Sequence, residues 1–292
     1  MTRSVNPVRG ETEPRIRLRL DVSYVGSEFH GWQIQNDLRT VQGELRNNLS
    51  RLLGRIVTPV GAGRTDSGVH ARGQVAHLTV ASAEEAVRVT NALPAMVPDD
   101  IGITAVRRVS PDFNACFSAV ARRYSYSLLE VRDIFRPFSW RIYRPLDRRT
   151  MNRAAADLKG SHDFSSFCKT RSLKADGNVC HVDLCNFDWT GDSAIFHVRA
   201  NRFLHHMVRN LVGTLVAIGH GTLPADCIPA ILAARDRNAA GKRAPAHGLF
   251  MEEVYYPDHV LDPAWRDPDS PYAADSNRDD EEIPFPEEGE SP

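Results

Sequence analysis

The sequence predicts an α+β fold built from two halves, each with an antiparallel sheet. The first observation is a period of two in several short segments, which is typical of half-buried strands. The second is a helical period in longer segments, which is typical of amphipathic helices. The third is their order, which is strand, helix, strands, then helix, strands, helix. This order differs from the regular βαβ alternation of a parallel sheet.

In the first half, hydrophobic and polar residues alternate over 15–24, which predicts a strand with one basic face. Thr40 is a suitable N-cap for a helix, and Gly54 is suited to end it. The apolar positions of that helix are Val41, Leu45, Leu49 and Leu52. A Gly-rich turn over 61–68 then leads to a predicted strand over 74–80. The alternating residues of a further strand are Tyr124, Tyr126 and Leu128.

Residues 130–149 are rich in Arg, Pro and aromatic residues, and we interpret them as a linker. The second half is predicted to begin with a helix over 150–158, followed by strands near 182–189 and 194–200. A helix is then predicted over 205–218. Its apolar positions include Val208, Leu211, Val212 and Leu215.

Composition divides the chain into four parts. We expect a flexible arm over 1–14, a first half over 15–140, a second half over 141–256 and an acidic tail over 257–292. The tail has few aliphatic residues, so we expect it to be disordered.

Charge is distributed unevenly between the tail and the rest of the chain. The tail carries twelve acidic and two basic residues, which leaves 34 basic against 25 acidic residues in the remainder. A basic body favours a polyanionic partner, although an ordinary solvated surface explains the charge equally well.

The composition also excludes several classes of protein. A hydrophobic content of 42% and a charged content of 25% are typical of a soluble globular protein. No apolar window can span a membrane, and the polar N-terminus is not a secretory signal. The five cysteines form no C-x-x-C pair, so a cytoplasmic location is expected. Because the adjacent His205 and His206 would point in different directions on a helix, we expect no metal site.

Asp66 is the best single candidate for a catalytic residue. It lies in a turn whose glycines at 61, 63 and 68 allow a ligand to approach the backbone closely. The turn lacks the sequence of a phosphate loop and the spacing of a dinucleotide fingerprint. An alternative is that its carboxylate only accepts hydrogen bonds from the local backbone. No Ser-His-Asp arrangement and no carboxylate pair is evident, so Asp66 is the candidate nucleophile.

Three further segments combine residue types that can contact RNA. Residues 31–35 carry Trp and Gln, and residues 113–126 carry aromatic and basic residues. In the third segment, 201–213, Arg209 lies among apolar residues and would need a carboxylate or phosphate partner if buried. For the aromatic residues, ordinary core packing is the alternative.

Taken together, these segments resemble the TruA family of tRNA pseudouridine synthases from about residue 15 to residue 256. The segment Gly63-Arg64-Thr65-Asp66-Ser67-Gly68-Val69-His70 is highly specific. The other matching segments are Tyr24-x-Gly26, Phe29-x-Gly31-Trp32-Gln33, Thr40-Val41-Gln42, Gly73-Gln74-Val75, Phe117-Ser118-Ala119 with Arg122-x-Tyr124, Gly160-x-His162-Asp163-Phe164, His206-Met207-Val208-Arg209-Asn210 with Gly213, and Ala244-Pro245-x-x-Gly248-Leu249.

The resemblance implies a fold of two pseudo-symmetric halves around a continuous antiparallel sheet with flanking helices. It implies a homodimer that binds tRNA in basic clefts. It also implies an isomerase without cofactor or metal, which detaches uridine at N1 and rejoins it through C5 at positions 38 to 40 of the tRNA anticodon stem-loop. The alternatives are a pseudouridine synthase acting at other RNA positions, a noncatalytic RNA-binding protein on this scaffold, and a glycosidase, which would need a second carboxylate.

The resemblance also implies roles for individual residues. Asp66 matches the nucleophile, and Arg64 matches the residue that holds the target base in its flipped position. Tyr124 matches the residue that stacks on the base and acts as general base. Arg209 matches the partner of the catalytic carboxylate.

Three further positions match residues that contact the substrate or line its pocket, namely Gln33, Arg122 and Leu249. Two positions depart from the family pattern. Val25 stands where members often have Asp, and Cys116 stands where they usually have Arg, a loss for which Arg122 or its neighbour Arg123 can compensate.

Overall fold

The computed structural model describes residues 15–172 and 177–264. The elements of the first half are β1 (Ile16–Tyr24), α1 (Val41–Leu53), β2 (Val60–Gly61), β3 (His70–Val80), α2 (Ala83–Met96), β4 (Ile101–Arg108) and β5 (Ala121–Leu129). Those that follow are β6 (Trp140–Arg141), α3 (Arg148–Ala156), β7 (Gly160–Asp163), β8 (Val179–Thr190), β9 (Ser193–Ala200), α4 (Met207–Gly219), α5 (Ile228–Ala234), β10 (Leu249–Tyr255) and α6 (Asp258–Leu261).

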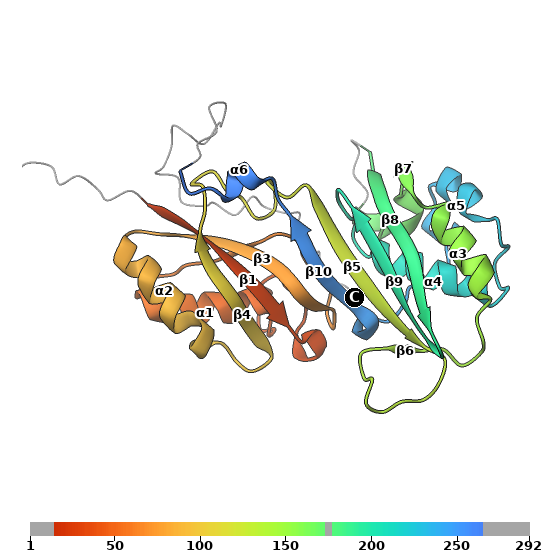
Figure 1. The fold of residues 1–292 in the computed structure, drawn as a ribbon, viewed down its shortest axis with the longest axis horizontal. Helices are drawn as coiled ribbons and strands as arrows, with labels where there is room; N and C mark the ends of the chain where they lie inside the picture. The colour runs from red at the N-terminus through yellow and green to blue at the C-terminus, as the bar shows by residue number, and fades with distance from the viewer. Residues whose placement is uncertain (1–14, 173–176, 265–292) are drawn as a thin grey trace, which may run out of the picture.

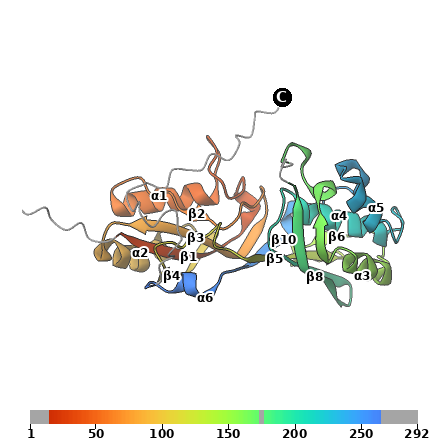
Figure 2. The same ribbon diagram turned by 90° about the horizontal axis from the view of Figure 1, so that it is seen from above.

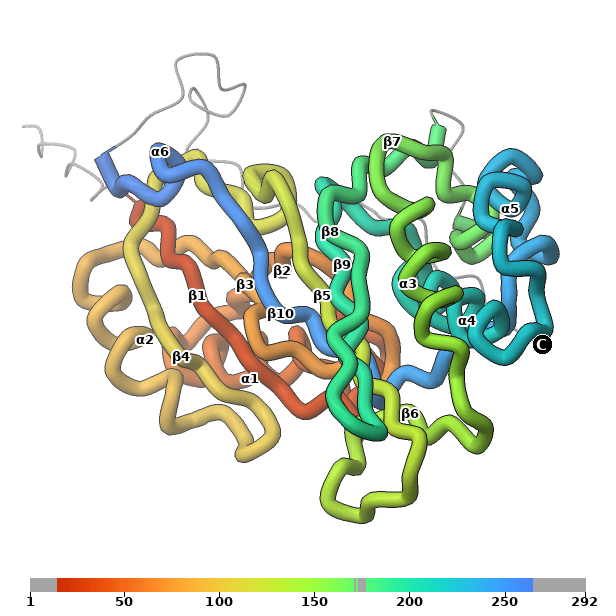
Figure 3. The backbone as a smooth tube through the Cα atoms, turned by 45° about the vertical axis from the view of Figure 1, so that its right-hand side comes forward, coloured from red at the N-terminus to blue at the C-terminus, as the bar shows by residue number. Residues whose placement is uncertain are grey.

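One sheet connects the two halves. Its strands follow the order β4-β1-β3-β10-β5-β9-β8-β7, with β2 paired to β3 and β6 paired to β5. Neighbouring strands are antiparallel, except that β10 is parallel to β3 and β6 is parallel to β5. Strand β10, drawn in blue, lies between β3 and β5 near the middle of the molecule (Figure 3). The predicted α+β fold with a continuous, largely antiparallel sheet is therefore confirmed.

Helices cover the two ends of the sheet. Helix α2 contacts α1 and packs on β1, β3 and β4, whereas α3 packs on α4 and β8. Figure 1 shows α1 and α2 beside the first-half strands and α3, α4 and α5 beyond β8 and β9. The view from above shows β5 and β10 between these two helical groups (Figure 2). None of the described helices combines the length and apolar character that a membrane span requires.

Local sequence signals account for β1 and α1. Every second residue of β1 is buried from Ile16 to Tyr24, as the period of two predicts. The Thr40 side chain accepts a hydrogen bond from the Gly43 N–H (3.3 Å), which caps the first turn of α1. Gly54 ends the helix with φ +70°, a conformation that favours glycine. These predictions are confirmed.

Other elements differ from the prediction. Strand β3 begins at residue 70 rather than 74, and α4 begins at residue 207 rather than 205. The segment 130–149 is more than a linker, because it contains β6 and the first turn of α3. The sequence pattern did not identify α2, β4 or β10. Pro94 lies inside α2 and interrupts a helical pattern, and the two strands are defined by pairing with segments far away in the sequence.

The described chain also extends beyond the predicted end of the second half. Helix α6 follows Tyr256, and the buried Val260 accepts a hydrogen bond at its carbonyl oxygen from the Ser110 N–H (3.3 Å). Residues 257–264 therefore belong to the fold, which corrects the start of the predicted disordered tail. Val260 joins the hydrophobic core, and Leu261 packs against it. Residues 265–292 and the predicted arm over 1–14 lie outside the described residues.

Candidate active site

Asp66 lies in the loop between β2 and β3, and the backbone of residues 29–32 supports that loop. The Trp32 N–H donates to the carbonyl oxygen of Thr65 (3.1 Å). Gly31 has φ +93°, and a Cβ atom at this position would lie 2.5 Å from the same carbonyl oxygen. Only glycine fits this close approach. Residues 29–32 thus fix the backbone that carries Asp66.

The aromatic residues near this loop are part of the core. Trp32 is only 1% exposed, and the Tyr24 hydroxyl is hydrogen-bonded to the Thr65 hydroxyl at 2.8 Å. For these two aromatic side chains, the structure favours the packing alternative over stacking on RNA bases. Gln33, the expected substrate contact, is partly exposed next to them.

Helix α4 brings Arg209 to Asp66 from the other half of the molecule. The Arg209 Nη1 donates to Asp66 Oδ2 at 2.8 Å, and the Arg209 Nε donates to the carbonyl oxygen of Ala244 at 2.9 Å. The side chains of Arg209 and Asp66 are 12% and 19% exposed. The carboxylate therefore sits in a largely buried ion pair and still has access to solvent, as a group that acts on a large ligand needs.

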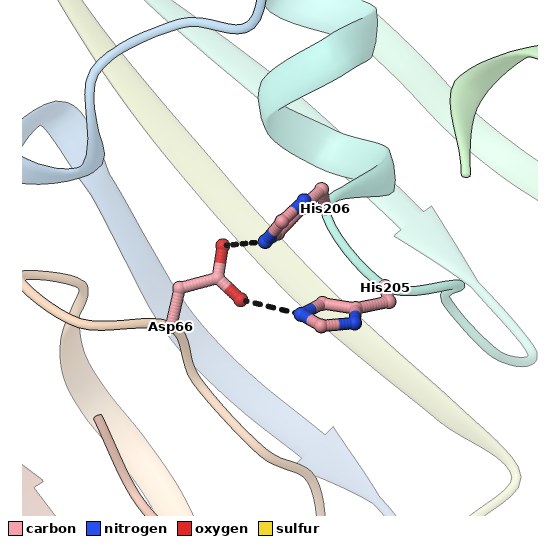
Figure 4. Close-up of side chains that lie close together, drawn as sticks. All are labelled: Asp66, His205 and His206. Atoms are coloured by element: carbon pink, nitrogen blue, oxygen red, sulfur yellow. Dashed lines mark ion pairs between the residues drawn. The ribbon is translucent and has the colours of Figure 1, made fainter. Parts of the chain in front are cut away.

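Two histidines also face this carboxylate, and the sequence did not predict it. His205 Nε2 lies 3.6 Å from Asp66 Oδ1, and His206 Nε2 lies 3.5 Å from Asp66 Oδ2. Figure 4 shows both rings directed at the carboxylate. The expectation that they point apart is wrong because neither residue is within the helix. Helix α4 begins at Met207, and His206 precedes it in a left-handed conformation with φ 65°.

The same groups are the candidate metal ligands among the described residues. One ligand atom each from Asp66, His205 and His206 lies within 4.8 Å of the others. However, Asp66 is already paired with Arg209, and the Arg243 Nη1 lies 2.7 Å from His206 Nδ1. Two guanidinium groups repel a divalent cation and occupy the ligand atoms. The two guanidinium groups therefore count against a divalent cation at this position.

The charge state of His206 follows from its surroundings. Burial, together with the neighbouring His205, Arg243 and Arg209, lowers the pKa of its ring to about 3, against the opposing effect of Asp66. The imidazole is consequently neutral at neutral pH. It carries one N–H, which can donate to only one partner.

Tyr124 on β5 lies across the loop from Asp66. A Cβ atom at Gly63 would be 4.0 Å from the Tyr124 hydroxyl, and the tyrosine ring packs edge-on against Phe203 with centroids 4.9 Å apart. Burial and, to a smaller extent, the charge of Asp66 raise the pKa of Tyr124 to about 12, against the opposing effect of Arg122. Leu249, expected to line the same pocket, is buried at the start of β10 next to β5.

Arg122 and Arg64 have different surroundings. The Arg122 guanidinium donates to the carbonyl oxygens of Ala62 (2.9 Å), Cys116 (2.7 Å) and Asn201 (3.2 Å). These contacts join the Asp66 loop to both halves, so the geometry favours a structural role for Arg122 over the expected contact with substrate. Arg64 is exposed on the loop, two residues before Asp66.

Sequence reasoning missed His205, His206 and Arg243 as members of the site. Their partner Asp66 lies more than a hundred residues away in the sequence, and no local spacing connects them. The left-handed backbone of His206 has no signal in a single sequence either. These residues are recognised as one site only in the structure, where the start of α4 lies next to the Asp66 loop.

Comparison with known proteins identifies the family. The family model of tRNA pseudouridine synthases matches residues 22–118 and 154–257, which include the Asp66 loop and α4. The chain is 44% identical over 248 residues to tRNA pseudouridine synthase A of Moorella thermoacetica, a match that covers 82% of this chain and 99% of that protein. It is 41% identical over 250 residues to the protein of the same name from Pseudoalteromonas atlantica, covering 83% and 93% of the two chains. The chain therefore belongs to the tRNA pseudouridine synthase family.

Proposed function

We propose that this chain is an isomerase that converts uridine to pseudouridine in tRNA, with Asp66 as the catalytic group. The observation that carries the proposal is the Asp66 carboxylate itself. It is held at Oδ2 by Arg209, projects from a glycine-rich loop that is fixed by the 29–32 segment, and remains partly exposed. A carboxylate with this support can meet the sugar of a nucleotide with little loss of orientation.

The reaction needs no oxidant, reductant or cofactor. The N1–C1′ bond of the target uridine breaks, a C5–C1′ bond forms, the proton on C5 leaves, and N1 gains a proton. The Asp66 carboxylate can attack C1′ to form a covalent intermediate or remove the proton from C2′, and we leave both routes open. Every heavy atom of the uracil base returns to the same nucleotide, so the enzyme must hold the detached base in place.

Tyr124 is the proposed stacking partner for that base. Its ring lies close to the Asp66 loop, and its raised pKa means that the hydroxyl is protonated at neutral pH. The proposed role as general base for the C5 proton therefore requires the base or a neighbouring group to accept the phenol proton at the same time. The target nucleotide must first be flipped out of its stem, which costs a few kcal/mol. Arg64, exposed on the loop beside Asp66, is proposed to hold the flipped state.

The proposed substrate is the anticodon stem-loop, with modification at tRNA positions 38, 39 and 40. The matched relatives carry the name tRNA pseudouridine synthase A, and the Asp66 and Arg209 segments lie within the matched residues. We further propose that the chain acts in the cytoplasm as a homodimer, with the site formed between a first half over 15–140 and a second half over 141–256. An excess of basic over acidic residues in the part of the chain before residue 257 favours an RNA partner.

Tritium release from tRNA labelled at uridine C5 tests this function. Transcripts that keep uridine only at position 38, 39 or 40 should each release tritium, and a transcript without uridine at these positions should release none. Release from the last transcript would favour a pseudouridine synthase that acts elsewhere in RNA. Tight tRNA binding without any release would favour the noncatalytic RNA-binding alternative. Sedimentation equilibrium with and without tRNA tests the proposed homodimer, since a monomer at micromolar concentration would contradict it.

A further inference from the structure

We propose that residues 131–144, here called the basic-aromatic segment, bind unpaired nucleotides of the RNA substrate. Phe135 and Tyr143 are the proposed stacking surfaces for bases, and the arginines of the segment are the proposed phosphate contacts. The inference rests on the proposed function in that tRNA is the ligand. The sequence pattern alone predicts a linker here, and none of the residues assigned to the reaction lies in this segment.

The first observation is the charge of the basic-aromatic segment. It contains four arginines and one acidic residue, Asp133. All four arginines are exposed, and they are Arg132, Arg136, Arg141 and Arg144. Asp133 Oδ2 lies 3.5 Å from the Nε atom of Arg136. No carboxylate of a described residue pairs with the other three arginines, so the segment presents positive charge that a polyanion can neutralise.

The second observation is that large apolar side chains of the same segment face solvent. Phe135 is 88% exposed, Tyr143 is 81% exposed and Ile134 is 71% exposed. Single exposed apolar residues are ordinary on a protein surface, but aromatic rings between arginines are typical of surfaces that bind single strands. The Arg141 guanidinium carbon lies 4.7 Å from the centroid of the Tyr143 ring, and the two groups together form a wider surface for a base.

The turn at the tip of the segment is ordered by hydrogen bonds of its own. Asp133 Oδ1 accepts from the Phe135 N–H (2.9 Å), and the Asp133 carbonyl oxygen accepts from the Arg136 N–H (3.3 Å). An aspartate that bonds the backbone two residues later fixes a turn without help from the side chains between. Ile134 and Phe135 are therefore held at the tip of an ordered turn while their side chains remain in solvent.

The segment projects from the sheet and is fixed at its base. Figures 1 and 3 show the chain between β5 and β6 extending beyond the ends of the strands. The Ser139 and Ser127 hydroxyls are hydrogen-bonded to each other at 2.7 Å. The Ile142 N–H donates to the Leu129 carbonyl oxygen at 2.8 Å. The projection therefore has a fixed place relative to β5, the strand that carries Tyr124.

A further contact places the base of the segment beside the Asp66 loop. The Phe138 ring packs against His70, with centroids 4.4 Å apart, and against Phe250, with centroids 6.1 Å apart. His70 is the first residue of β3 and ends the glycine-rich run that contains Asp66. The backbone from Phe138 to Phe135 spans at most about 11 Å. An RNA whose target nucleotide reaches Asp66 therefore has neighbouring nucleotides close to this segment.

Charge decides between RNA and a second copy of the chain as the partner of the segment. In a symmetric dimer the same patch contacts itself, so two such segments would bring arginines against arginines. An RNA strand instead supplies phosphates to the arginines and base faces to the rings. Because a paired stem hides its base faces within the helical stack, the nucleotides that fit this segment are unpaired.

Equilibrium binding tests the inference without turnover. The probes are an unmodified tRNA transcript and a fully paired RNA duplex. Phe135→Ser removes one ring, and Ile56→Ser is the matched control at an 83% exposed side chain outside the segment. We expect Phe135→Ser to weaken tRNA binding by about 5- to 150-fold, the usual effect of losing one stacked base, and to leave duplex binding unchanged. Phe135→Tyr retains a ring and should bind tRNA normally, and Ile56→Ser should change neither affinity.

Arg132→Gln tests the phosphate contacts separately. It should weaken binding of both probes and reduce the slope of log K against log salt concentration by about 0.7, the contribution of one phosphate contact to a single strand. Arg88→Gln is the matched control at an exposed position on α2, and it should leave the slope unchanged. An unchanged slope in Arg132→Gln would contradict the phosphate contact.

Unchanged tRNA affinity in Phe135→Ser, or an equal loss in Ile56→Ser, would overturn the inference. Sedimentation equilibrium of the same variants identifies the other partner. A loss of self-association in Phe135→Ser would assign the segment to a second copy of the chain and would also overturn the inference. Failure of the proposed function is a different result, because it would appear as tRNA binding that depends on Phe135 without any release of tritium.

Discussion

At the scale of single residues, Asp66 gains its setting from both halves of the chain. The 29–32 segment fixes its backbone, and Arg209 fixes one oxygen of its side chain. Arg209 uses two different nitrogen atoms, one for Asp66 and one for the Ala244 carbonyl oxygen. This divided hydrogen bonding is a property of the rigid guanidinium fork, which a lysine cannot reproduce.

Substitutions at Arg209 should show whether its positive charge alone or also its hydrogen-bonding geometry supports Asp66. Arg209→Lys retains the positive charge but can occupy only one of the two positions, so we expect kcat to fall on the order of 10- to 100-fold with a small drop in melting temperature. Arg209→Met leaves a mostly buried carboxylate without its partner and should reduce the free energy of unfolding by about 3 kcal/mol. Steady-state kinetics and urea denaturation measure the two effects. Full activity in Arg209→Lys would show that charge alone is sufficient.

Two substitutions at Tyr124 distinguish its ring from its hydroxyl. Tyr124→Phe keeps the edge-on contact with Phe203 and the surface on which a base can stack. It should therefore leave tRNA affinity nearly unchanged and lower kcat. Tyr124→Leu removes the ring and should weaken tRNA binding by about 1–3 kcal/mol, the usual contribution of one stacked base. Filter binding and tritium release measure both, and normal binding by Tyr124→Leu would contradict stacking.

At the scale of helices and strands, the sequence predicted elements whose signals are local. The alternation in β1 and the cap and stop residues of α1 correspond directly to the structure. Strand β10 has no comparable signal, because its place between β3 and β5 is set by pairing partners far away in the sequence. Contacts between segments far apart in the sequence also explain why the sequence did not place His205 and His206 in the site. Asp66 was predicted from its own loop, whereas His206 depends on where α4 begins and how α4 meets that loop.

At Gly213 in α4, close packing should reverse the usual preference of a helix for alanine over glycine. Glycine to alanine inside a helix normally stabilises it by up to about 1 kcal/mol. Here the added Cβ would lie 1.7 Å from the Lys242 carbonyl oxygen, so α4 and the segment over 242–244 would have to separate. We expect Gly213→Ala to lower the melting temperature and, by separating Ala244 from Arg209, to lower kcat as well. A higher melting temperature, as helix propensity alone predicts, would contradict this packing.

At the scale of the whole molecule, β10 and Arg122 join the two halves. Strand β10 comes late in the chain yet completes the sheet beside β3, and Arg122 links the carbonyl oxygens of Ala62 and Asn201 across the halves. The site lies where these connections meet. Its geometry therefore depends on the stability of the complete fold, including its response to pH.

Buried histidines should make the fold sensitive to acid. Burial lowers the pKa of His70, His77 and His206 below the ordinary value of 6.5. As the pH falls below 6.5, the unfolded chain binds protons that the native state resists, so the stability present above pH 6.5 is progressively lost. Each histidine contributes at most about 1.4 kcal/mol per pH unit, and for His206 the loss continues to about pH 3.

Urea denaturation between pH 7.5 and 5 measures this loss. The free energy of unfolding should fall over that range, and His77→Gln should reduce the slope by up to one proton. His30→Gln makes the same replacement at an exposed position and is the matched control. Stability that is constant over this range would contradict the burial of these rings in solution.

The central claim is that the Asp66 carboxylate performs the isomerisation, and a single comparison tests it most directly. Tritium release from C5-labelled tRNA is measured for Asp66→Asn, which keeps the size and shape of the side chain, together with the dissociation constant for the same tRNA. The account predicts that release is abolished while tRNA binding and melting temperature stay close to those of the unsubstituted protein. Continued release of tritium by Asp66→Asn at a comparable rate would contradict it.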